Sequence, residues 1–195
     1  MLLSEKINNE QLVEKARQCI NCNHMLPHSP RPIFIWPQNP KIILISQAPG
    51  RLAHESGLAW NDASGERLRT WLGVNRVQFY ESGNFAVLPM SFCFPGYKNN
   101  ADAPPLKPCA PMWHSSFLAQ AKPELILYIG RYSQQYYLPE YANLTTAISD
   151  FSHLLPSKAA LPHPSGRNNR WLAKHSWFER DLVPVLQQRV FTALS

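Results

Sequence analysis

Residues 41–50 read KIILISQAPG, and this segment changes abruptly from an apolar run to a polar loop. The run holds three isoleucines, Ile42, Ile43 and Ile45, whose β-branched side chains favour strands. A short run with no alternating polar positions is typical of a strand that is buried on both faces, as in parallel sheets. Pro49 and Gly50 then end the strand. The segment therefore predicts a buried parallel strand with a loop at its carboxyl end.

Three further apolar runs, at 85–92, 125–130 and 158–161, have the same character and predict three more strands. Helical patterns lie around them, at 4–20, 64–72, 110–121, 132–138 and 169–192. Ser64 is the expected N-cap of the second helix, and Pro184 is expected to kink the last one. Strands that alternate with helices predict an α/β fold, a three-layer αβα sandwich around a central, mostly parallel four-stranded sheet. We expect residues 1–195 to form a single domain.

The composition argues against a membrane-spanning or secreted protein and favours a nucleic-acid partner. Hydrophobic residues make up 45% of the 195 residues, which suffices for an ordinary core, and no apolar run is long enough for a transmembrane helix. Because Glu5, Lys6 and Glu10 interrupt the start of the chain, it lacks the apolar core of a signal peptide, and we expect a cytoplasmic protein. The net charge of +6 favours a polyanionic partner, nucleic acid rather than a membrane.

Four cysteines stand at positions 19, 22, 93 and 109. The cytosol is reducing, so disulfides are disfavoured there. Cys19 and Cys22 form a CxxC pair, and with Cys93 and Cys109 they offer four soft ligands suited to an iron–sulfur cluster or zinc. The alternative is four unconnected buried thiols.

Two polar segments follow predicted strands and carry side chains suited to chemistry, since ligands bind beyond the carboxyl ends of parallel strands. Trp60 could stack on a planar ligand, and Asp62 could hold a water or face a developing cation. The alternative is that Trp60 belongs to the core and Asp62 caps the helix. His163 lies between two prolines that fix its backbone, which suits an aimed side chain as well as a structural histidine. Residues 165–170 read SGRNNR, which suits a DNA-backbone contact or a solvated loop.

Together these features resemble the uracil-DNA glycosylase superfamily, from about residue 19 to residue 186. The four cysteines match the spacing of its iron–sulfur branches, families 4 and 5, and residues 94–98 (FPGYK) stand where those families have Pro-Pro-Gly-Asn. Residues 46–50 (SQAPG) look like the first motif, and residues 60–65 (WNDASG) look like the family-5 pattern aromatic-x-G-D-x-S-G. Residues 163–165 (HPS) look like the second motif.

The resemblance implies a monomeric DNA glycosylase that hydrolyses the N-glycosidic bond of uracil or another deaminated base and so starts base excision repair. In this reading Asp62 is the catalytic carboxylate, which faces the sugar, favours the cation and orients the attacking water. His163 donates a hydrogen bond to the base. The base-binding residues would be Gln47, Ala48, Pro49, Gly50 and Trp60, and the DNA-binding residues Ser165, Arg167, Asn168 and Arg170. Cys19, Cys22, Cys93 and Cys109 would hold a structural [4Fe–4S] cluster, with zinc as the alternative. A non-catalytic DNA-binding relative is the alternative function.

Three positions depart from the family patterns. Gln47 stands where family 4 has glutamate, and Ala48 stands where the best-known members have an aspartate base. Pro89 replaces the family-4 asparagine that reads the uracil edge, so the identity of the base stays open. The nearby carboxylates are Glu55, Asp62 and Glu66, of which similarity to family 5 selects Asp62. An unrelated nucleotide-binding α/β enzyme would need a glycine-rich phosphate loop, which residues 50–53 (GRLA) do not supply.

Overall fold

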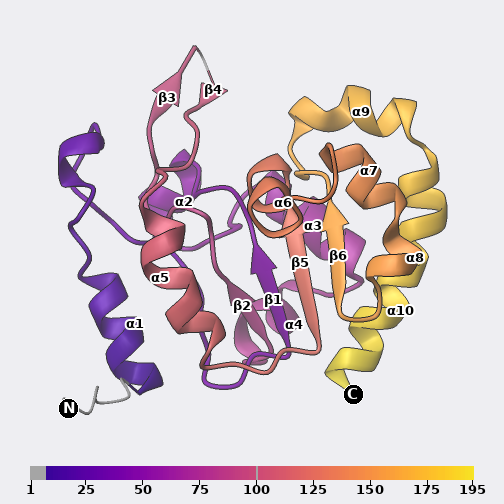
Figure 1. Cartoon of the computed structure of the whole chain (residues 1–195), viewed down its shortest axis with the longest axis horizontal. Helices are drawn as coiled ribbons and strands as arrows, with labels where there is room; N and C mark the ends of the chain where they lie inside the picture. Colours follow the sequence, from indigo (N-terminus) through magenta and orange to yellow (C-terminus); the bar gives the residue numbers. More distant parts are fainter. Residues whose placement is uncertain (1–7, 100) are drawn as a thin grey trace.

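The computed structural model describes residues 8–99 and 101–195, and its centre is a four-stranded sheet (Figure 1). The strands are β1 (Ile42–Ile45), β2 (Phe85–Val87), β5 (Leu125–Ile129) and β6 (Lys158–Leu161). They lie in the order β2-β1-β5-β6, and every pairing between them is parallel. The predicted α/β fold with a four-stranded parallel sheet is confirmed.

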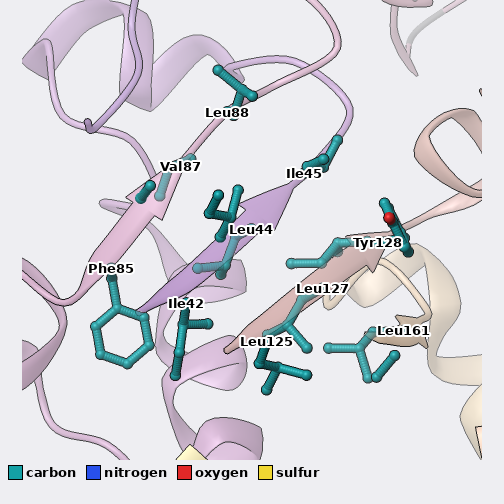
Figure 2. Close-up of a cluster of buried hydrophobic side chains, with 14 of the residues drawn as sticks. Ile42, Leu44, Ile45, Phe85, Val87, Leu88, Leu125, Leu127, Tyr128 and Leu161 are labelled. Atoms are coloured by element: carbon teal, nitrogen blue, oxygen red, sulfur yellow. The ribbon is translucent and has the colours of Figure 1, made fainter. Parts of the chain in front are cut away.

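The strands form the middle of the core because helices cover both faces of the sheet. Ile42 pairs with Phe85 on one side and Leu125 on the other, and Leu44 pairs in the same way with Val87 and Leu127. All of these side chains are buried, and Figure 2 shows them in adjoining rows across the strands. The apolar run at 42–45 is thus the mark of a central strand with no solvent-facing side.

Helices form a layer on each side of the sheet. Figure 1 shows α3 (Ala63–Leu72) and α4 (Arg76–Glu81) behind it, with α5 (Cys109–Leu118) and α6 (Arg131–Tyr137) in front. Four other helices pack on these layers or on the sheet edge: α1 (Asn9–Arg17) on α5, α10 (Val183–Leu194) on α3, and α7 (Leu144–Ser149) and α8 (Phe151–Leu154) on β6. This confirms the three-layer arrangement. No helix in the described part of the chain is long and apolar enough to cross a membrane.

The second strand is shorter than the predicted segment 85–92. It ends at Val87, because Pro89 has no N–H to donate to a neighbouring strand. The chain nevertheless continues beside β1, since Leu88 N–H donates to the Leu44 carbonyl and Met90 N–H to the Ser46 carbonyl. Residues 88–92 therefore form a buried, irregular extension of β2 next to the loop that follows β1.

Two predicted helices also differ from the structure. The predicted helix 169–192 is broken into α9 (Asn169–Lys174), a π-helical turn (Phe178–Leu182) and α10. Pro184, where the sequence predicts a kink, lies in the first turn of α10 directly after the π-helical turn. The predicted helix 4–20 is observed over Asn9–Arg17 with Asn8 as its N-cap; the predicted start at Ser4 lies outside the described residues.

A small antiparallel hairpin that the sequence did not predict stands at the carboxyl end of the sheet. It consists of β3 (Tyr97–Lys98) and β4 (Ala101–Asp102), with Tyr97 opposite Asp102. In Figure 1 it rises at the top, the end towards which β1 and β6 point. Gly96 begins it with a φ of +82°, and a side chain there would meet the Pro27 ring. The hairpin thus brings residues 101 and 102 to the carboxyl edge of the sheet.

Candidate active site

Two adjoining cavities lie at the carboxyl edge of the sheet. The outer cavity has a volume of about 440 Å³, in the range of small-molecule sites. It is lined by Gln47, Ala101, Asp102, Gly130, Arg131, Tyr132, Leu144, His163, Ser165, Arg167 and Asn168. The inner cavity is smaller and is lined by Ser46, Pro49, Gly50, Ala53, Ala59, Trp60, Asp62, Ser64, Val87, Pro89, Asp102, His163 and Ser165. Asp102, His163 and Ser165 line both cavities.

Each strand of the sheet contributes to these walls through the residues that follow it. Gln47 follows β1, Pro89 follows β2, Gly130 follows β5 and His163 follows β6. The strand order reverses direction between β1 and β5, so the loops after these two strands diverge and leave room between them. The topology therefore places a hollow where the sequence motifs meet.

His163 is a neutral hydrogen-bond donor in this arrangement. Burial lowers the pKa of His163 to about 4, although the nearby Asp62 charge opposes this shift, so the ring is uncharged at neutral pH. The Ser165 N–H donates to Nδ1 at 3.3 Å, which leaves the ring proton on Nε2. The Asn168 side chain donates to the His163 carbonyl at 2.7 Å and fixes the backbone. The histidine can thus donate from Nε2 without carrying charge.

Trp60 faces this histidine, with 5.4 Å between the ring centroids. Its φ of +60° lies in the left-handed region, an unfavourable conformation for a bulky residue that functional sites often contain. The buried Arg69 guanidinium donates to the Trp60 carbonyl at 3.2 Å. A Cβ on Gly65 would lie 1.8 Å from that carbonyl oxygen, so only glycine fits there. The start of α3 and the Trp60 turn therefore hold one another in place.

Asp62 is the N-cap of α3. Its Oδ1 accepts a hydrogen bond from the Gly65 N–H at 2.8 Å, so the prediction that Ser64 caps this helix is wrong. The same side chain lines the inner cavity, and its charge acts on His163. Capping and a place in the site are therefore not exclusive alternatives. Among the described residues, Oδ2 has no hydrogen-bond donor.

The other predicted base-binding and DNA-binding residues are distributed unevenly. Gln47 lines the outer cavity, Pro49 and Gly50 line the inner one, and Ala48 lines neither. Ser165, Arg167 and Asn168 line the outer cavity, whereas Arg170 is exposed on α9 outside both cavities.

The two remaining carboxylates that the sequence suggested lie outside both cavities. Glu55 pairs with Arg51 at 2.7 Å, and Glu66 pairs with Arg69 at 2.6 Å. Neither side chain lines a cavity wall. Both carboxylates are therefore paired with arginines outside the site, and of the three only Asp62 lines a cavity wall.

Asp102 and the pair Arg131 and Tyr132 are cavity residues that sequence reasoning missed. Asp102 belongs to the unpredicted hairpin, and no local sequence pattern predicts its place in the site. Arg131 and Tyr132 begin α6 directly after the strand that ends at Ile129, so their position after a predicted strand was an available signal. The Arg131 guanidinium lies 4.7 Å from the Tyr132 ring centroid and donates to its hydroxyl at 2.8 Å.

The four cysteines line a third, small cavity together with Pro30, Pro32, Ser91, Phe92 and Leu106. Among residues 8–99 and 101–195, no three histidine, cysteine or acidic side chains converge as ligands of one metal ion do. The Phe92 N–H donates to Cys109 Sγ at 3.3 Å, a contact that suits a thiolate. Burial raises the pKa of Cys93 to about 11 and that of Cys109 to about 12, so both are protonated thiols unless a cation binds.

A comparison with known families covers most of the chain. Residues 33–187 match the model of the Uracil DNA glycosylase superfamily, which spans most of the chain. The match includes β1, β6 and the loops that carry Trp60, Asp62 and His163, and it begins after Cys19 and Cys22. The chain therefore belongs to the uracil-DNA glycosylase superfamily.

Proposed function

We propose that this protein is a DNA glycosylase that hydrolyses the N-glycosidic bond of uracil or another deaminated base and thereby starts base excision repair. Membership of the superfamily supports a glycosylase-like activity on DNA. The observation that carries the proposal is the pairing of His163 with Trp60: a neutral, oriented donor faces an aromatic ring inside a hollow at the carboxyl edge of the sheet. Such a site can stack a flat ring and polarise one of its oxygens.

The target nucleotide must leave the base stack first, because its C1′ atom cannot be reached within a duplex. Trp60 would replace part of the stacking that the base loses. Gln47, Pro49 and Gly50 line the space around it, and the backbone of this loop would hold the base edge. Ser165, Arg167 and Arg170 would contact the phosphates. The +6 net charge supports binding to the polyanionic strand.

Bond cleavage leaves an oxocarbenium-like sugar and a base anion, so opposite charges develop on the two sides of the bond. His163 Nε2–H would donate to the base oxygen where negative charge grows, a contribution of about 3 kcal/mol for a preorganised donor. An uncharged imidazole suits this task, because it need not lose a proton to the departing base. Asp62 would lie on the sugar side, where its charge favours the cation.

We also propose that Cys19, Cys22, Cys93 and Cys109 hold a [4Fe–4S] cluster. Their four thiols surround one cavity rather than converge on one point, and a cluster spaces its four thiolates more widely than a single zinc ion does. The glycosidic reaction needs no electron transfer, so the cluster's role would be structural. It would tie the segment after α1 to the loop before α5.

Freshly purified protein should therefore be brown, absorb broadly near 400 nm and contain about four irons per chain. The measurements are an absorbance spectrum and metal analysis of the anaerobically purified protein. Colourless protein with one zinc per chain would contradict the cluster, but the four cysteines would remain the expected metal ligands.

Incubation with DNA tests the proposed activity. Single-stranded and duplex oligonucleotides that contain one uracil, hypoxanthine or xanthine are incubated with the protein, and alkali then cleaves any abasic site. We expect cleavage at one or more of these bases, none in unmodified DNA, and a rate at least 100-fold lower for His163→Ala. Tight DNA binding without cleavage of any substrate would instead favour the non-catalytic relative.

A further inference from the structure

Asp102 places a second carboxylate at the junction of the two cavities. It lines both, as do His163 and Ser165, although it belongs to the hairpin rather than to a loop of the sheet. Its Oδ2 lies 3.8 Å from the position that a Cβ on Gly50 would take, so it adjoins the loop after β1. No described residue forms a hydrogen bond or an ion pair with it. Among the described residues, its carboxylate is therefore unpaired where the two cavities meet.

The other acidic side chains near the site have partners. Glu55 and Glu66 are paired with arginines outside the cavities. Asp62 lines the inner cavity, but its Oδ1 caps α3, and a proton taken up by this carboxylate would weaken the capping bond. Asp62 is thus suited to remain a fixed negative charge, whereas Asp102 can accept a proton without loss of a hydrogen bond or ion pair to any described residue.

We infer that Asp102 is the catalytic general base that activates water, an inference that rests on the proposed glycosylase function. The C1′–N bond breaks and its electron pair leaves with the base. The water oxygen forms the new bond to C1′, and one water proton passes to the Asp102 carboxylate. The products are an abasic site and the base anion, which His163 stabilises and which takes a proton from solvent, while Asp102 returns its proton to solvent. Atoms and charge balance without a further reactant.

Two carboxylates then divide two tasks that conflict in one group. The charge that favours the oxocarbenium ion must persist through the transition state, whereas a general base is neutralised as the reaction proceeds. Asp62, anchored at a helix start, serves the first task. Asp102, on a separate two-stranded hairpin, serves the second. This division explains how the chain can lack carboxylates at positions 47 and 48 and still hydrolyse the bond.

Single-turnover excision, measured with enzyme in excess over the preferred substrate, tests the inference. Asp102→Asn should lower the rate about 100-fold or more while DNA binding and the unfolding temperature stay near wild type. Glu55→Gln is the matched control, because it also removes a carboxylate near the site but lines neither cavity, and it should excise normally. Formate should raise the rate of Asp102→Ala at least several-fold, because a small carboxylate can enter the vacated space.

The results separate the two proposals. If wild-type protein excises a base and Asp102→Asn does so at a similar rate, the general base is not Asp102, and the glycosylase function stands. If Asp102→Asn and Asp102→Ala lose DNA binding and formate restores nothing, Asp102 has a structural role and the inference is wrong. If wild-type protein excises none of the three bases, the proposed function fails and the inference fails with it.

Discussion

Asp62 serves the helix and the cavity at the same time, and one substitution distinguishes the two contributions. Asparagine is as good an N-cap as aspartate, so Asp62→Asn should keep the free energy of unfolding within about 0.5 kcal/mol of wild type. Without the negative charge, the excision rate should fall about 100-fold. Urea unfolding and single-turnover excision measure the two effects. Excision at the wild-type rate would leave Asp62 as a cap alone.

Gly65 is where the Trp60 turn depends on the absence of a side chain. A Cβ there would lie 1.8 Å from the Trp60 carbonyl oxygen, so Gly65→Ala must displace the turn or the start of α3. We expect a loss of about 2 kcal/mol or more in the free energy of unfolding. The control is Gly83→Ala. Gly83 has a φ of +72°, and a Cβ added there would meet no atom of a residue beyond its chain neighbours within 4 Å, so this variant should cost about 1 kcal/mol from backbone strain alone. Equal losses in the two variants would contradict the steric argument.

The elements differ in how well the local sequence predicts them. β1, β5 and β6 were predictable because a strand buried on both faces is a continuous apolar run, a local property. The hairpin at 97–102 was not, because each of its strands has two residues and is largely exposed. Its position depends on contacts such as Gly96 against Pro27, far apart in the chain. Asp102 was missed for this reason, whereas His163 follows a predicted strand directly.

The break after α9 shows a second limit of local patterns. The apolar spacing of 169–192 fits one long helix, but His175 stacks on Trp171 with 4.4 Å between centroids, and its Nδ1 lies 2.9 Å from the Trp171 carbonyl. The chain turns there, and α10 then packs against α3 on the far face of the sheet. Local contacts at the break and packing of α10 on a distant element accompany this interruption, and single-sequence periodicity does not contain that information.

The loop from Ser165 to Arg170 is expected to bind phosphates rather than read bases. Replacing Arg167 and Arg170 by alanine should weaken DNA binding about equally for all sequences. It should also flatten the dependence of log Kd on log salt by up to about two units. Binding titrations at several salt concentrations measure the slope. Arg180→Ala is the control, since Arg180 pairs with Asp181 at 2.7 Å and lines neither cavity. If the double variant and Arg180→Ala show the same salt slope, the DNA binds elsewhere.

The cysteine cavity links two segments that are far apart in the chain, the one after α1 and the one between β2 and α5. Cys93→Ser should therefore lose iron and lower the unfolding temperature by more than about 5 °C, because a bound metal group contributes its binding energy to folding. The excision rate of the protein that remains folded should change less than 10-fold. An unchanged unfolding temperature with wild-type iron content would contradict the ligand role.

At the scale of the whole molecule, one buried histidine, His114, connects the site to the helices in front of the sheet. His114 on α5 lies 2.9 Å from the Pro89 carbonyl through Nε2 and 2.7 Å from the Tyr137 hydroxyl through Nδ1. The carbonyl can only accept, so Nε2 donates to it and Nδ1 accepts from the tyrosine. The three residues join α5, α6 and the segment after β2, whose Pro89 lines the inner cavity. A charged His114 would lose the bond to Tyr137 as it now stands.

This network makes the stability of the protein depend on pH in a stated direction. Burial lowers the pKa of His114 to about 4, whereas an unfolded histidine titrates near 6.5. The unfolded chain therefore takes up its proton first, so the contribution is fully present above pH 6.5 and is lost as the pH falls towards 4. Between pH 7 and pH 5 the protein should lose about 2 kcal/mol of its free energy of unfolding through His114, and His163 adds a loss in the same direction.

Urea unfolding at pH 7, 6 and 5 measures this loss. His114→Gln should be less stable at pH 7 yet lose about 2 kcal/mol less on acidification, and the exposed control His153→Gln should match wild type. If all three proteins lose stability equally, His114 is not held neutral by the fold.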